Sequence, residues 1–169
     1  MIANNSCPYS SIVFLILALV LDNFIYKILF LGLCITSTIF HMYDHEILPE
    51  RNIDVIYYYD MISILLLGIH ILTNNIYFTI IIALIIICLF KKINSFAGLF
   101  YIIGLIKIIY VLFKKENIVL LTTIIIIAFI AHYDNSKKYS FEPYHISWKP
   151  YNALIWHLCN ACILYLYLK

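Results

Sequence analysis

Charged residues are scarce in this chain, where Asp, Glu, Lys and Arg together make up 12% of 169 residues. Hydrophobic residues make up 64% of the sequence, and its mean hydropathy is +0.97. A net charge of +2 on so apolar a chain offers no surface that could follow a phosphate backbone, which excludes a nucleic-acid-binding role. The composition is that of an integral membrane protein, whose partners are membrane lipids.

The sequence also lacks the marks of a cleaved leader and of a cysteine framework. Asn4, Asn5 and Ser6 precede the first apolar stretch in place of Lys or Arg, and no small-residue cleavage site follows it, so we expect this stretch to remain as a helix. Cys159 and Cys162 have a metal-like spacing, but no second pair accompanies them, and we interpret them as small packing residues. Without repeats or a soluble domain, residues 1–169 are predicted to form a single domain.

The apolar residues fall into seven stretches, which predict an all-α bundle of seven transmembrane helices. Crossing the hydrocarbon takes about 20 residues, and the second, third, fifth and seventh stretches meet that length. The others are short and would span only by thinning the bilayer or through snorkelling flanks. Runs such as 80–89 do not alternate polar and apolar residues, so transmembrane strands are not predicted. The predicted helices cover residues 10–21, 24–42, 54–73, 76–90, 95–113, 118–132 and 151–168.

Three ionisable residues interrupt these apolar stretches: His41, Asp60 and His157. An ionisable side chain inside hydrocarbon costs about 2.5–3.5 kcal/mol even on lenient scales, so it usually faces a bundle interior, a partner or a metal. Counting helices places all three within roughly 10 Å of one membrane face, the face of the N-terminus. Only His70 is expected towards the opposite face. The same count brings three more histidines to the side of the N-terminus: His45, His132 and His145.

This convergence suggests a metal-assisted site. Imidazole nitrogens are common zinc ligands, and His41 and His157 are the candidates here. Asp60 would orient or deprotonate a zinc-bound water, whose pKa zinc lowers to about 7. Ser37 lies one helical turn before His41, and its hydroxyl would hold a substrate carbonyl or its oxyanion. Such a set of groups near the membrane face suits hydrolysis of a lipid amide or ester.

Each of these residues also has a structural interpretation. A serine in a membrane helix is more often a packing or back-bonding residue, as Ser37 would then be. A histidine at a helix end, such as His41, is often interfacial. Asp60 would be one member of a buried structural pair, and His157 a hydrogen-bonded core histidine.

The same residues carry a family resemblance. The run Ser37 to His41, an aspartate early in the next helix, and Trp156-His157 early in the last helix resemble the CREST superfamily of seven-helix membrane hydrolases. Its members include alkaline ceramidases, the adiponectin and progestin receptors, enzymes that remodel GPI anchors, and myomaker-like proteins. The resemblance implies a zinc-dependent hydrolase in which His41 and His157 bind the metal and Ser37 and Asp60 are catalytic.

The gap from His41 to Asp60 is longer than in ceramidases and is closest to the myomaker-like branch, which also has a short polar element after the histidine, as in residues 41–44. The last helix of the family carries two histidines four residues apart, and the earlier position is Ala153 in this sequence. The zinc site implied by the resemblance is therefore one ligand short, since a catalytic zinc normally has three protein ligands.

Two main classes of function follow. The first is a zinc-dependent lipid hydrolase, and the second is a non-enzymatic membrane-remodelling or fusion-type protein on the same scaffold, which Ala153 favours. A ligand receptor is a third class, but it would need a soluble signalling region that the sequence lacks. The sequence does not give the substrate, the orientation in the membrane, the organelle or the oligomeric state.

Overall fold

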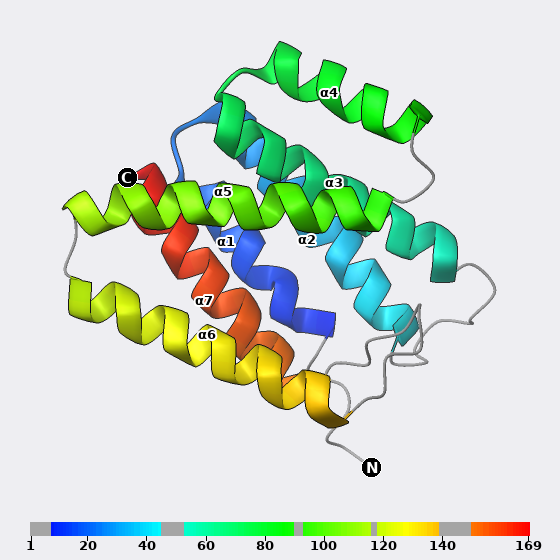
Figure 1. The fold of residues 1–169 in the computed structure, drawn as a ribbon. Helices are drawn as coiled ribbons and strands as arrows, with labels where there is room; N and C mark the ends of the chain where they lie inside the picture. The colour runs from blue at the N-terminus through cyan, green and yellow to red at the C-terminus, as the bar shows by residue number, and fades with distance from the viewer. Residues whose placement is uncertain (1–7, 45–52, 90–92, 116–117, 139–149) are drawn as a thin grey trace.

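The computed structural model describes residues 8–44, 53–89, 93–115, 118–138 and 150–169. These residues form a short 3-10 turn and seven α-helices, which confirms the all-helical prediction (Figure 1). The predicted and observed helix ends agree within a few residues, apart from the last turns of the sixth helix. The elements are η1 (Pro8–Ser11), α1 (Ile12–Val20), α2 (Phe24–Asp44), α3 (Ile53–Thr73), α4 (Ile76–Leu89), α5 (Ile93–Lys115), α6 (Ile118–Lys138) and α7 (Pro150–Leu168).

Two tight connections are built on asparagine. The side-chain oxygen of Asn23 accepts hydrogen bonds from the backbone N–H groups of Ile25 and Tyr26, at 3.0 and 3.3 Å, and so caps the start of α2. Asn75 caps α4 in the same way. Asn74 has φ +48°, a left-handed conformation that asparagine tolerates at the end of a helix. The chain therefore reverses direction within three residues between α1 and α2 and within two residues between α3 and α4.

Helix α3 lies at the centre of the bundle and packs most extensively against α5 and α2. In Figure 1, α5 crosses in front of α3, and α4 lies on the outer side of α3. Glycine allows the crossing of α3 and α5 to be close, because a Cβ atom added at Gly68 would lie 3.0 Å from the backbone carbon of Phe100. Lys107 of α5 donates to the carbonyl oxygens of Ile71 and Leu72, at 2.7 and 3.1 Å, and satisfies the end of α3.

The short helix α1 contributes buried side chains to the main hydrophobic core. Phe14 and Leu17 of α1 are 5% and 4% exposed, and they pack in one cluster with Phe30 of α2 and Leu164 of α7. A helix of nine residues is about 14 Å long, too short to cross a bilayer alone. Helix α1 thus packs one face against α2 and α7 and leaves the other face exposed.

Three helices of the described residues, α2, α3 and α5, are long and apolar enough to cross a membrane. The apolar parts of α4, α6 and α7 are shorter. Large side chains such as Leu19, Tyr77 and Val119 are more than 70% exposed, as lipid-facing residues are. The fold is therefore compatible with a membrane protein that has three candidate spans, a smaller number than the seven predicted from the sequence.

The close crossing of α3 and α5 leads to a stability prediction. Gly68→Ala should lower the free energy of unfolding by about 1–3 kcal/mol, because the methyl group meets the backbone of α5 rather than a flexible side chain. The matched control is Gly98→Ala, whose Cβ atom meets no atom within 4 Å and which should be neutral or slightly stabilising. Unfolding in detergent micelles measures both, and equal stability of the two variants would contradict a tight α3–α5 contact.

Candidate functional site

The histidines of α2 and α7 lie in direct contact at one end of the bundle. The ring centroids of His41 and His157 are 5.4 Å apart, with an interplanar angle of 62°. His41 is 4% exposed, and His157 is partly buried. The two imidazoles therefore lie side by side, although their helices are separated by more than 100 residues in the sequence.

The turn η1 enters this cluster from the N-terminal side and contributes two buried hydroxyl groups. Ser10 Oγ lies 2.8 Å from His157 Nδ1 in a hydrogen bond. Ser11 Oγ lies 2.5 Å from Thr38 Oγ1 of α2. The two serines are 1% and 0% exposed. The hydrogen bond between Ser10 and His157 fixes the orientation of the imidazole.

Aromatic rings surround the histidine pair. Phe14 of α1 meets the ring of His157 edge-on, with centroids 5.3 Å apart. The ring centroid of Phe40 in α2 lies 5.4 Å from that of His41 and 5.3 Å from that of Tyr57 in α3. The imidazoles are therefore held in an apolar surrounding where a polar interaction is stronger than in water.

Asp60 is buried in α3 at 5% exposure and faces α2. Its Oδ1 lies 3.2 Å from Thr36 Oγ1, which also lies 3.1 Å from Ser63 Oγ. Thr36 Oγ1 also lies 3.1 Å from the carbonyl oxygen of Gly32. Its single hydroxyl proton can be donated to only one of these three oxygens at a time. Since Thr36 is five residues before His41, Asp60 lies about 7.5 Å deeper along α2 than the imidazole pair.

Ser37 is 3% exposed in α2, between the two threonines that contact Asp60 and Ser11. It lies one helical turn before His41, as the sequence requires. The four predicted residues thus belong to one polar end of the bundle. Within the described part of the chain, however, no three His, Cys, Asp or Glu side chains form a group that could hold a metal ion. The side chains of His45, His132 and His145 lie outside the described residues.

A second polar link, between α5 and α7, was not predicted from the sequence. The hydroxyl group of Tyr101 donates to Asn160 Oδ1. Asn160 Nδ2 in turn donates to the carbonyl oxygen of Trp156 at 2.7 Å. The signal in the sequence is an asparagine inside an apolar helix, three residues after His157. This link holds the middle of α7 against α5, one helical turn beyond the histidine. Of the cysteine pair in α7, Cys159 is buried and Cys162 is exposed, and neither forms a disulfide.

His70 lies at the opposite end of α3 in a separate polar group. Its Nδ1 lies 3.2 Å from Thr79 Oγ1 of α4, and its ring meets that of Tyr26 at 4.9 Å. Thr79 Oγ1 also lies 2.8 Å from the carbonyl oxygen of Asn75 and 3.2 Å from Thr73 Oγ1. With 1% exposure and hydrogen bonds inside the bundle, His70 has the surroundings of a structural histidine.

Searches of protein-family models, of curated proteins and of solved structures found no match to this chain.

The hydrogen bond between Ser10 and His157 is open to a direct test. Ser10→Ala should destabilise the protein by about 1 kcal/mol, the usual contribution of one buried hydrogen bond. In a double-mutant cycle with His157→Phe, the second substitution should add less than its separate effect. Unfolding in mixed detergent micelles gives the free energies, and the exposed Ser95→Ala is the control. Strict additivity of the pair would show that the contact does not contribute.

A second prediction concerns His70. His70→Gln should lower the melting temperature, because a buried group loses its hydrogen bond with Thr79. Any zinc content and any hydrolytic activity should stay at the parent level, since His70 lies far from the His41–His157 pair. Metal analysis of the purified variant measures this, and loss of zinc would show that the site is at the wrong end of the bundle.

Proposed function

We propose that this chain is a CREST-like integral membrane protein whose polar end binds zinc between His41 and His157 and hydrolyses a lipid amide or ester. The observation that carries the proposal is the contact between the two imidazoles. Three candidate spans and the three shorter apolar helices α4, α6 and α7 support a multi-pass arrangement, against which the short helix α1 packs. The family itself is part of the proposal and rests on the resemblance of the residues in α2, α3 and α7.

The geometry of the histidine pair fits a shared metal ion. When two imidazoles bind one zinc at about 2.0–2.1 Å in tetrahedral geometry, their ring centroids lie roughly 5 Å apart. The observed separation is 5.4 Å. Because Nδ1 of His157 is engaged by Ser10, its Nε2 is the nitrogen that would face a metal. When bound, zinc would polarise a substrate carbonyl and lower the pKa of a water molecule.

Asp60 and Ser37 would serve the reaction from α3 and α2. A buried carboxyl group beside a hydroxyl is suited to accept a proton and pass it on, and Thr36 holds Asp60 in place for this role. The hydroxyl of Ser37, one turn before His41, would donate to the oxyanion that develops on the substrate carbonyl. Both residues are at least nine-tenths buried, so water competes little for these hydrogen bonds.

The depth of the site favours a lipid substrate. His41 lies three residues before the end of α2 and Asp60 lies seven residues after the start of α3, which places the site about 5–10 Å along the helix axes from these ends. The interfacial layer of a bilayer leaflet is roughly 5–8 Å thick outside the 30 Å hydrocarbon core. The site would thus lie near the boundary where the ester or amide bonds of membrane lipids are found.

A second candidate function is a non-enzymatic membrane-remodelling protein on the same scaffold. Two observations favour it: residue 153 is alanine, and the described residues hold no group of three metal-ligating side chains. The hydrogen bonds of His157 to Ser10 and of Asp60 to Thr36 would then serve packing alone.

Metal content separates the two functions. The parent protein should bind zinc weakly, and His41→Ala or His157→Ala should abolish that binding. Ala153→His should retain zinc more tightly through dialysis against a mild chelator, because residues 153 and 157 share a helix face. Zinc per chain is the measurement. A parent that already holds one zinc, with no gain from Ala153→His, would mean that another residue supplies the third ligand, and His132 and His45 would be mutated next.

Activity gives an independent test of the enzyme proposal. Reconstituted protein loaded with zinc should release fatty acid from ceramide or phospholipid vesicles, and Asp60→Asn should reduce the rate by about 100-fold or more. His70→Gln should not change it. An Asp60→Asn variant that melts like the parent and hydrolyses at the same rate would exclude the proposed role of Asp60. No hydrolysis by zinc-loaded parent or Ala153→His protein would favour the non-enzymatic function.

A further inference from the structure

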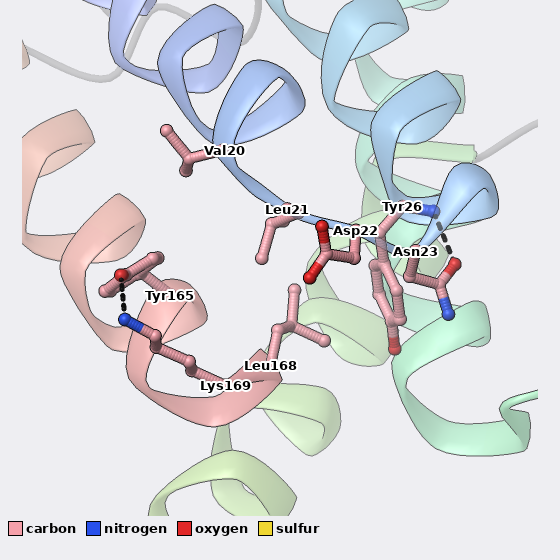
Figure 2. Close-up of a pocket in the computed structure, with 8 residues that line it drawn as sticks. All are labelled: Val20, Leu21, Asp22, Asn23, Tyr26, Tyr165, Leu168 and Lys169. Carbon is pink, nitrogen blue, oxygen red and sulfur yellow. Dashed lines mark hydrogen bonds between the residues drawn. The ribbon is translucent and has the colours of Figure 1, made fainter.

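A cavity opens at the end of the bundle opposite the histidine pair. Its volume is about 300 Å³, and its walls include Asp22 from the turn after α1, Tyr26 of α2, and Tyr165 and Lys169 from the end of α7 (Figure 2). The chain turns at Asp22 and Asn23 and α7 ends here, so the cavity lies at the ends of these helices. None of the four residues that form the proposed hydrolase site lines it.

The polar groups of the cavity differ in whether they have a hydrogen-bond partner within the protein. Lys169 Nζ donates to the hydroxyl oxygen of Tyr165 at 2.7 Å. Among the described residues, neither the carboxylate of Asp22 nor the phenol oxygen of Tyr26 has a hydrogen bond or an ion pair, and Tyr26 is only 3% exposed. Figure 2 shows the Asp22 carboxylate extending past Leu21 towards Leu168, while Lys169 turns towards Tyr165. The cavity thus presents an acceptor with a negative charge and a buried phenol hydroxyl.

We propose that this cavity binds the head group of a phospholipid that carries a primary ammonium, of the phosphatidylethanolamine type. The ammonium would donate to Asp22 and to the phenol oxygen of Tyr26. The phosphate would lie near Lys169, which keeps two N–H donors beyond the one given to Tyr165. The acyl chains would run along the lipid-facing side chains of Leu19 and Val20, which are 71% and 54% exposed. This site is independent of the proposed hydrolase function.

The chemistry of the cavity selects among head groups. A primary ammonium has three N–H donors, which match the Asp22 carboxylate and the Tyr26 oxygen. A choline head group has no N–H donor and would leave the buried phenol without a hydrogen bond. A glycerol head group has no positive charge, so the Asp22 carboxylate would be left without a counter-charge while the phosphate lies near Lys169.

The test measures which lipids the purified full-length protein retains. Detergent micelles are doped with equal amounts of phosphatidylethanolamine, phosphatidylcholine and phosphatidylglycerol with identical acyl chains, and bound lipids are counted by native mass spectrometry. The parent should prefer phosphatidylethanolamine by about tenfold, the size of one charge-assisted hydrogen bond. Asp22→Asn should remove that preference, and Tyr26→Phe should reduce it several-fold. Asp22 is exposed, so the fold of that variant is expected to persist, and a thermal melt checks it.

Two control variants test whether the lipid preference depends on the cavity rather than on other charged residues of the protein. Lys114→Gln changes a charge at the same end, where Lys114 lies over the ring of Tyr110 outside the cavity, and it should keep the preference. Asp60→Asn alters the proposed hydrolase site and should also keep it. Equal retention of the three lipids by the parent, or an unchanged preference in Asp22→Asn, would overturn the proposal. Equally tight binding of soluble phosphoethanolamine would assign the cavity to a soluble amine and overturn the lipid assignment.

Discussion

In a lipid environment a polar side chain has no water to bind, so it must find its partner inside the protein. This constraint organises both ends of the bundle. At one end, α2, α3 and α7 bring His41, Asp60 and His157 into the interior, where hydroxyl groups and aromatic rings meet them. At the other end, His70 and Lys107 bond to groups of α3 and α4. An unsatisfied polar group in hydrocarbon costs several kcal/mol, so these contacts fix the register of the helices.

The same constraint accounts for the order of the polar end. The imidazoles are oriented by Ser10, by an edge contact with Phe14 and by a tilted contact with Phe40, so a ligand bound between them would require little reorganisation. The N-terminal turn η1 is part of this arrangement, because its serines connect α7 to α2 through buried hydrogen bonds. A metal ion bound by both His41 and His157 would add a further link between α2 and α7, which already meet at this point.

Hydropathy and helix counting were sufficient to predict the helices and the meeting of His41 with His157. Both depend on the length and direction of apolar segments, which are properties of the sequence itself. The partners of these residues were not predictable in the same way. Ser10 reaches His157 because η1 turns into the bundle, and Thr36 rather than its neighbour Ser37 contacts Asp60 because of the rotation of α2 about its axis. Side chains of successive residues in a helix point in directions about 100° apart, and hydropathy does not resolve this difference. The sequence also showed that the first apolar stretch is short. It did not show that side chains of α1 are buried, because their burial depends on packing against α2 and α7.

The central claim is that His41 and His157 share one zinc-binding site. Solid-state NMR of histidine-labelled protein in bilayers tests it most directly, with His41→Phe and His157→Phe identifying the two residues among the six histidines. The account predicts a cross-peak between the two imidazoles that disappears in either variant, and a joint shift of both sets of ring nitrogens when zinc is added. Absence of the cross-peak, or a zinc-dependent shift of only one imidazole, would contradict it.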